Sequence, residues 1–240
     1  MTPDALQDVV GVKFWPSTAA AASVARVGPW AIRDGGGGGK RVSAATAEGS
    51  WQASDVTRAE AAMQALGQDR LFLIRTRDAD LDAALQAQGY RVVDPVVAYA
   101  APVAEIAAVP PARMTSFPHW PPMEIDRALW AEGGIGPARV AVRERVTGPK
   151  TVILGRSSDR AAGVAFVAMR GDVAMLHALE VSPALRRQGS AYNILRAAAV
   201  WAQDNGAKTL SLVVTEANVP ARSLYASLGM TIVGQYHYRQ

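Results

Sequence analysis

The chain has 240 residues, half of them hydrophobic, which is enough to bury one large core or two smaller ones. It contains no cysteine and only three histidines, so disulfides and thiolate chemistry are excluded, and no metal site is expected. The net charge of +4 comes from scattered arginines, whereas a nucleic-acid-binding surface would concentrate basic residues on one element.

Membrane and secretory segments are not expected either. No stretch approaches about 18 uninterrupted apolar residues, and the first residues, which include Asp4 and Asp8, lack the pattern of a secretory signal. We therefore expect a cytoplasmic protein with no membrane partner and no nucleic-acid partner.

The first conspicuous stretch along the chain is "RDGGGGGKR", residues 33–41. A Walker-type phosphate loop ending at Lys40 would need glycine at position 34 and serine or threonine at position 41, where this chain has Asp34 and Arg41. Residues 41–49 have strand-like character and no helix cap. The glycine run therefore predicts a flexible hairpin between two strands, not a phosphate site.

The proline-rich stretch "VPPARMTSFPHWPP", residues 109–122, predicts an inter-domain connection without a regular element. Beyond it, the sequence predicts two helices that stop at glycines and three antiparallel strands joined by tight turns. A long helix over residues 190–205, a strand, a capped helix and a final strand complete the chain. The predicted order is ααβββαβαβ.

An internal similarity links the two halves of the chain. When Gly89 is aligned with Gly229, both halves show a strand, a helix and a further strand without a gap. The matched segments are residues 71–75 with 211–215, and residues 81–93 with 221–233. Because helix-glycine-strand units are common, the similarity is compatible with a duplicated unit and with coincidence.

The most informative segment is "LHALEVSPALRRQGSAYNILRAAAVWA", residues 176–202, in which a strand, a short basic loop and a helix follow one another. Backbone amides at the start of the helix and the side chains of Arg186 and Arg187 could hold a diphosphate. Gly189 would let the backbone approach it closely. The alternative is a solvated basic turn before an ordinary helix.

This segment resembles the GNAT superfamily of acyl-CoA-dependent N-acetyltransferases. The pyrophosphate loop of that superfamily reads Gln/Arg-x-x-Gly-x-Gly/Ala, and "RRQGSA", residues 186–191, fits every specified position. The preceding "LEVSP" and the downstream "NVPARSLYASLGM" also match in order and spacing, with Met230 in place of a phenylalanine of the family. The resemblance covers residues from about 150 to 240 well, and the first half only through the internal similarity.

The resemblance implies a mixed α/β fold with a mostly antiparallel central sheet flanked by helices, in two GNAT-like halves in tandem. Residues 1–105 would form a degenerate, shortened GNAT-like domain, residues 106–122 a linker, and residues 123–240 the catalytic domain. The first half keeps the elements without the chemistry, because the positions that correspond to the loop, to Asn218 and to Tyr225 hold Thr46, Gly49, Trp51, Asp78 and Leu85.

The resemblance also implies that acetyl-CoA is the co-substrate. Its acetyl and pantetheine arm would contact the backbone of Leu179 and Val181, and Asn218 would contact pantetheine. Asn218 is also a good helix N-cap, and both roles can coexist. The pyrophosphate would lie on the loop formed by Arg186, Arg187, Gln188, Gly189, Ser190 and Ala191.

Three side chains are candidates for the chemistry itself. Tyr225 matches the family tyrosine that protonates the departing thiolate, although it also lies on an apolar helix face. Glu180 and His177 are candidates for the base that accepts the proton of the amine, with an ion-paired carboxylate and a core histidine as their alternatives. Their odd spacing places them on opposite faces of a regular strand unless a bulge intervenes.

Together these features predict an N-acetyltransferase in which a primary amine attacks the thioester of acetyl-CoA directly. A longer acyl-CoA or an aminoacyl donor on the same fold is an alternative. So is a non-catalytic module that binds acyl-CoA or a partner, because such a module needs neither acid nor base. The identity of the acceptor, a small molecule or a peptide amine, and the oligomeric state are left open.

Overall fold

The computed structural model describes residues 19–240. The first half contains β1 (Ser23–Val27), β2 (Trp30–Asp34), α3 (Lys40–Ser43), β3 (Thr46–Ala47), α4 (Ala53–Ala65), β4 (Phe72–Arg75), η2 (Thr76–Asp78), α5 (Ala79–Ala87) and β5 (Val92–Pro102). The second half contains α6 (Val103–Ala107), β6 (Ser116–His119), α7 (Glu124–Glu132), α8 (Pro137–Glu144), β7 (Lys150–Ser157), β8 (Arg160–Arg170), β9 (Val173–Val181), η3 (Pro183–Leu185), α9 (Ser190–Asp204), β10 (Thr209–Thr215), α10 (Val219–Ser227) and β11 (Thr231–Arg239). From residue 123 onward, the predicted order ααβββαβαβ is confirmed.

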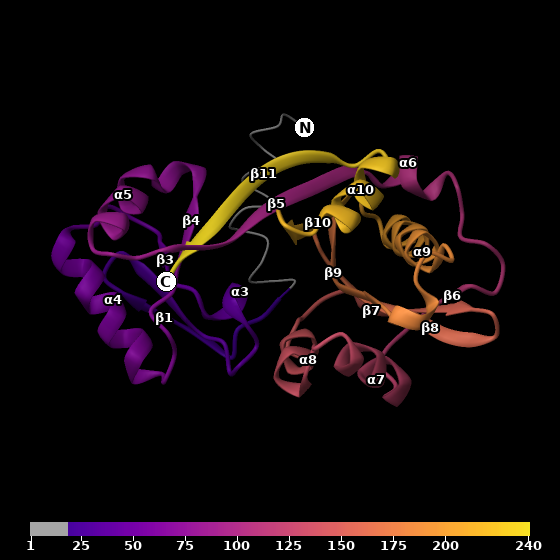
Figure 1. Cartoon of the computed structure of the whole chain (residues 1–240), viewed down its shortest axis with the longest axis horizontal. Helices are drawn as coiled ribbons and strands as arrows, with labels where there is room; N and C mark the ends of the chain where they lie inside the picture. Colours follow the sequence, from indigo (N-terminus) through magenta and orange to yellow (C-terminus); the bar gives the residue numbers. More distant parts are fainter. Residues whose placement is uncertain (1–18) are drawn as a thin grey trace.

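Two sheets organise the described residues. One has three strands in the order β1-β2-β3, and the other has eight strands in the order β4-β11-β5-β10-β9-β8-β7-β6. In the larger sheet, only β9 and β10 pair in parallel. Around β7 to β9, α9 covers one face and α7 and α8 cover the other (Figure 1). The predicted fold class, a mostly antiparallel mixed sheet flanked by helices, is confirmed.

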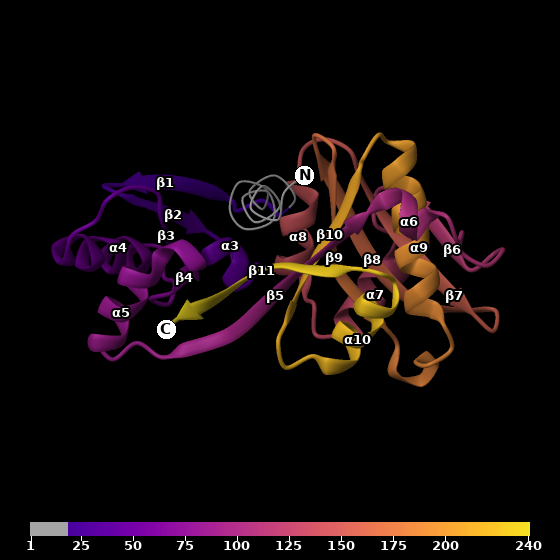
Figure 2. The same cartoon turned by 90° about the horizontal axis from the view of Figure 1, so that it is seen from above.

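The two halves exchange their last strands. Strand β5 of the first half lies between β10 and β11 of the second, and β11 continues into the first half to pair with β4 (Figures 1 and 2). Where β5 and β11 pair, Val96 faces Tyr236, which is its counterpart when Gly89 is aligned with Gly229. The halves are therefore related by an approximate twofold axis that passes between these two strands.

The same symmetry extends to the strands on either side. In the first half, Ala45, next to β3, forms an isolated parallel bridge with Phe72 of β4. In the second half, β9 pairs with β10, the counterpart of β4, and this pairing is also parallel. Helices α5 and α10 also occupy matching positions in the alignment of the two halves. The internal similarity of the sequence is thus also a similarity of arrangement.

Two local predictions are wrong. The proline-rich connection was expected to lack regular structure, but Ser116–His119 forms β6 and pairs with β7. Pro118 is tolerated there because an edge strand has one side on which no backbone donor is needed. The second error concerns part of the prediction for the glycine run: β2 and β3 on either side of it do pair antiparallel, but the short helix α3 lies between them.

The glycine run packs tightly against the second half. A Cβ atom on Gly38 would lie 2.3 Å from Val142 Cγ2, and one on Gly39 would lie 3.1 Å from Arg139 Nε. Gly39 also has a φ of 95°, a conformation that favours glycine. The glycines therefore let the loop and α3 approach α8 at a distance that larger residues would prevent.

Candidate active site

An opening in the large sheet forms the centre of the candidate site. Strands β9 and β10 pair from Val173 and Thr209 up to Leu176 and Leu212, where the parallel ladder ends. Beyond that point the strands separate, so residues 177–181 and 213–215 border a gap. Backbone groups along this edge of β9 are thereby left without a strand partner on β10, which suits an extended ligand.

A bulge in β9 changes the direction of the side chains at the gap. His177 lies opposite Phe166 and Glu180 lies opposite Val164, while Ala178 takes a φ of 51° between them. Because Phe166 and Val164 are two residues apart on one strand, they share a face, and their partners share it as well. His177 and Glu180 therefore both face α7 and α8, because a bulge intervenes, which was the expected exception to regular alternation.

His177 is buried, and neither of its ring nitrogens is open to a substrate proton. Its Nδ1 lies 3.1 Å from a guanidinium nitrogen of Arg41. Since arginine can only donate, Nδ1 accepts this bond and the ring proton resides on Nε2. Burial, together with the charges of Arg41 and Arg143, holds the pKa of His177 well below its usual value. Neither nitrogen offers a lone pair to an incoming amine.

Glu180 has a different environment. Burial raises its pKa above the usual value, and the positive charges of Arg186 and Arg139 oppose this shift. The carboxyl group lies against the end of α7, where a Cβ atom on Gly133 would be 2.6 Å from Glu180 Cδ. A half-buried carboxylate with a raised pKa is suited to accept a proton near neutral pH. The geometry favours Glu180 over His177 as the base.

Tyr225 of α10 is buried against Tyr99 of β5, with the ring centroids 5.7 Å apart. Burial, and after it the negative charge of Glu180, raises the pKa of Tyr225 to about 12. The phenol is therefore protonated at neutral pH, and it lies within electrostatic range of Glu180. It also belongs to the core under α9, so the packing role considered from the sequence is present as well.

The loop before α9 has the form expected of an anion cradle. Gly189 is the N-cap of α9 with a φ of 82°, and a Cβ atom at this position would meet no other atom within 4 Å. No side chain caps the helix, so the amides of Ser190 and Ala191 are open to an acceptor from outside the chain. Buried Leu185 anchors the loop beneath them.

The other predicted contact residues surround this loop and the gap. Arg186 Nε donates to the carbonyl oxygen of Val181 at 3.1 Å, and Gln188 Oε1 accepts from Ser157 Oγ at 2.9 Å. Arg187 takes a φ of 64°, and Leu179 packs against the core under α9. The structure thus places the predicted loop residues at one end of the gap.

Asn218 has the N-cap role that its position before Val219 and Pro220 suggested. Its Oδ1 accepts from Ala221 N at 3.2 Å and caps α10. Asn218 also borders a cavity of about 450 Å³ at the gap, on the side that faces the first half. The amide nitrogen of its side chain therefore lies at the border of the space available to a ligand.

This cavity contains the residues that the sequence interpretation missed. Its walls come from α3 and β5 of the first half and from α8, β9, β10 and β11 of the second. Arg41, Arg139 and Arg143 all line it. Arg139 and Arg143 are four residues apart on α8, a spacing that places both on one helix face and is visible in the sequence. The contribution of Arg41 depends on the packing of the two halves and has no local signal.

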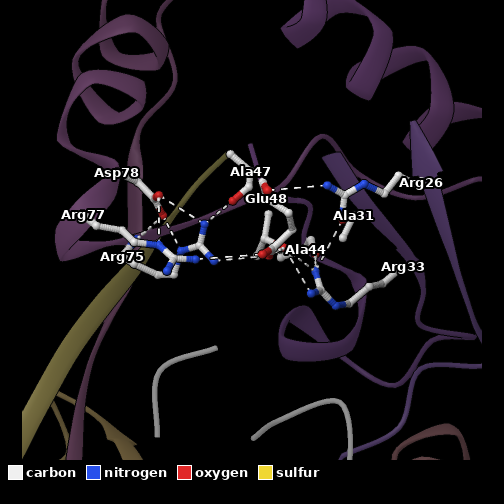
Figure 3. Close-up of polar contacts among 10 residues, drawn as sticks. Arg26, Ala31, Arg33, Ala44, Ala47, Glu48, Arg75, Arg77 and Asp78 are labelled. Atoms are coloured by element: carbon white, nitrogen blue, oxygen red, sulfur yellow. Dashed lines mark hydrogen bonds and ion pairs between the residues drawn. The ribbon is translucent and has the colours of Figure 1, made fainter. Parts of the chain in front are cut away.

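In the first half, an ion-pair network occupies the place that corresponds to the gap (Figure 3). Arg75, 6% exposed, donates from Nε to Asp78 at 2.6 Å and from a terminal nitrogen to Glu48 at 3.2 Å. It also bonds the carbonyl oxygen of Ala47, which ties β3 to β4. No helix begins at Gly49, the counterpart of Gly189, because α4 starts at Ala53. The corresponding segment therefore lacks an open helix N-terminus.

Within residues 19–240, no group of three or more histidine, cysteine or carboxylate side chains is arranged to hold a metal ion. In the same part of the chain, no helix is both long and apolar enough to cross a membrane.

Comparisons with known proteins agree with this arrangement. The family model described as "Acetyltransferase (GNAT) family" matches residues 118–230. The "Uncharacterized N-acetyltransferase YobR" of Bacillus subtilis (strain 168) is 35% identical over 54 residues, which make up 22% of each protein. The chain thus matches about a fifth of the length of that curated relative.

Two solved structures are similar over most of the chain. A GCN5-related N-acetyltransferase from Kribbella flavida gives a TM-score of 0.67 at 16% identity and covers 91% of this chain and 89% of that one. The "Tandem GNAT protein from the clavulanic acid biosynthesis pathway" gives a TM-score of 0.57 at 15% identity, with coverage of 92% and 84%. At these identities the similarity establishes the fold.

Proposed function

Because this chain belongs to the GNAT family of acetyltransferases through residues 118–230, we propose that it transfers an acetyl group from acetyl-CoA to a primary amine. One observation carries this proposal: the gap between β9 and β10 lies beside an uncapped helix N-terminus that begins at a left-handed glycine. An extended thioester and a diphosphate would use these two features at once. The cytoplasm is the proposed location.

In the proposed reaction, the pyrophosphate of acetyl-CoA binds the amides at the start of α9, and its pantetheine arm follows the free edge of β9. The amine nitrogen attacks the thioester carbon, so a C–N bond forms and the C–S bond breaks. Glu180 accepts the proton lost by the amine, directly or through a water molecule. The binding energy of the remote diphosphate holds the thioester in the gap, where the two reactants meet.

Tyr225 would stabilise the departing sulfur. Because its pKa of about 12 lies well above that of a thiol, complete transfer of its proton to the thiolate is unfavourable. A hydrogen bond from the phenol to the developing negative charge has no such cost and still lowers the barrier. We therefore assign Tyr225 the role of hydrogen-bond donor to the leaving thiolate.

The test combines thermal unfolding with acetyl-CoA and a thiol-release assay over a panel of primary amines. We expect acetyl-CoA to raise the Tm of the protein, and Gly189→Glu to abolish that rise because a carboxylate would occupy the anion cradle. Gly171→Glu is the matched control, since Gly171 has a φ of 58°, also faces open space and lies on the hairpin between β8 and β9. Equal acetyl-CoA binding by both variants would refute the cofactor assignment.

The same assays separate an enzyme from a binding module. For an enzyme, Tyr225→Phe should retain the Tm shift with acetyl-CoA and lower kcat by about 10-fold to 100-fold, the effect of one hydrogen bond to a charged group. If acetyl-CoA stabilises the protein and no amine in the panel releases thiol, the module that binds acyl-CoA without catalysis becomes the better account.

A further inference from the structure

The cavity at the gap holds an excess of positive charge. Lys40 and Asp94 both border it and form an ion pair with Nζ and Oδ2 2.6 Å apart. Asp94 is the only acidic residue among the described residues that line the cavity. The guanidinium groups of Arg41, Arg139 and Arg143 share this space with that single ion pair, so positive charge predominates in it.

Arg143 is the most deeply buried of the three arginines. Its side chain is 7% exposed and lies over the ring of Trp130, 4.7 Å from the centroid. One terminal nitrogen donates to the carbonyl oxygen of Arg139, while Nε has no hydrogen-bond partner in the described part of the chain. A buried guanidinium with an unused donor is unfavourable unless something accepts from it.

Electrostatics around Arg143 point the same way. Burial, and after it the charges of Arg139 and Arg41, lowers the pKa of Arg143 to about 10. Close to this group, the buried Nε2 of His177 also has no hydrogen-bond partner among residues 19–240, and its tautomer makes it a donor. Two buried donors and three like charges around one cavity are the features of a site for an anion.

The position of the cavity connects this charge to the proposed reaction. Ala178 of β9 and Val213 and Thr215 of β10 line it, so it opens onto the gap where the thioester would lie. A molecule in the cavity can therefore reach the gap with one end while its other end contacts the arginines of α8. Arg139 is close enough to Glu180 to affect the pKa of its carboxyl group, which places the arginines beside the proposed base.

We propose that the cavity binds the acceptor and that the acceptor is an amine that also carries a carboxylate, held by Arg139 and Arg143. A carboxylate matches the planar guanidinium group with two parallel hydrogen bonds. Arg41, brought by the glycine run and α3, adds charge from the first half. This inference rests on the proposed function, because it names the class of acceptor for the same site.

The decisive experiment compares pairs of amines that differ only in charge. Thiol release is measured with 4-aminobutanoate and its amide, 4-aminobutanamide, and with 5-aminopentanoate and its amide. We expect kcat/KM for each acid to exceed that for its amide by about 10-fold to 100-fold, the value of a charge-assisted hydrogen bond or two. Equal rates for acid and amide, with transfer intact, would overturn the inference and leave the proposed function standing.

Variants then locate the effect. Arg139 is exposed on α8, so Arg139→Gln should fold and should lower the ratio of kcat/KM for each acid to kcat/KM for its amide by about 10-fold. Any effect of Arg139 on Glu180 is common to acid and amide and leaves this ratio unchanged. Arg139→Lys should restore part of the difference because it keeps the charge. Arg160→Gln, at the exposed start of β8, is the matched control and should change nothing. A loss that is equal for acids and amides in Arg139→Gln would contradict the proposal.

Binding without turnover keeps this inference separate from the proposed function. Butanoate, which has the carboxylate and lacks the amine, should raise the Tm of the wild-type protein in the absence of acetyl-CoA and should not raise that of Arg139→Gln. If this shift is found while no amine is acetylated, the anion site stands and the proposed function fails. If butanoate has the same effect on both proteins, the anion site fails.

Discussion

Individual residues at the gap show how strongly the surroundings of a side chain decide its role. Glu180 and His177 share a face of the sheet. The lone pair of His177 Nδ1 already accepts a hydrogen bond from Arg41, so of the two side chains only Glu180 can accept a proton from an amine. From the sequence alone the two residues could not be distinguished. Arg41 lies far from His177 in the chain, and the left-handed Ala178 that forms the bulge is neither glycine nor asparagine.

The assignment of Glu180 predicts a specific pH dependence. Because burial raises the pKa of Glu180 in the folded protein, kcat/KM should rise with pH through a value above the ordinary range of glutamate, as the carboxyl group loses its proton. Glu180→Gln should remove this limb and lower kcat by roughly 10²-fold to 10⁴-fold. Thiol release by the wild type and by Glu180→Gln is measured from pH 4.5 to 8.5. The fraction of neutral amine rises equally for both proteins, so the ratio of the two kcat/KM values should rise with pH, and a constant ratio would point to another base.

At the scale of elements, local signals in the sequence predicted the second half well. Glycine stops, tight turns and runs of β-branched residues are short-range features, and they gave the correct order from α7 to β11. The errors arose where distant contacts decide the structure. Helix α3 has no side-chain cap and packs at the interface with α8, and β6 forms only because β7 offers a partner.

Close packing between α9 and the sheet gives a prediction about one glycine of β8. A Cβ atom on Gly163 would lie 2.6 Å from the carbonyl oxygen of Glu180 and 3.1 Å from Ile194 Cδ1. Gly163→Ala should therefore lower the free energy of unfolding by about 1–3 kcal/mol, the usual cost of overpacking. It should also lower kcat, since it displaces the backbone of β9 at the base.

Urea denaturation of Gly163→Ala measures this cost, with Gly136→Ala as the control. A Cβ atom on Gly136 meets nothing within 4 Å, and its φ of −78° is open to any residue. The control should unfold within about 0.5 kcal/mol of the wild type. If the two variants are equally stable, β8 and β9 adjust to the extra methyl group more easily than the distances indicate.

For the whole molecule, the exchange of last strands makes the halves interdependent. Strand β5 supplies the neighbour that both β10 and β11 need, and β11 supplies the neighbour of β4. The sequence revealed the repeated pattern of strand, helix and strand in the two halves. It could not reveal the exchange, because the choice of partner between two similar strands depends on the assembled sheet and not on the pattern within either strand.

If the two halves are expressed separately, neither should therefore fold. We expect residues 106–240, expressed alone, to lack a cooperative unfolding transition, because β10 and β11 would be left with unpaired edges. Co-expression with residues 1–105 should restore the transition and the Tm shift with acetyl-CoA. Differential scanning calorimetry tests both statements, and a stable fragment 106–240 that binds acetyl-CoA alone would show that the second half is independent.

The crossing of β5 and β11 also has a mechanical consequence. The two halves are joined by a long antiparallel ribbon formed by β5 and β11 (Figure 2). Its midpoint is the pair of Val96 and Tyr236, and both residues line the arginine-rich cavity. Any rotation of one half against the other must change the twist of this ribbon. Because Val96 and Tyr236 border the cavity, a change in the twist of β5 and β11 would change the space available to the proposed acceptor.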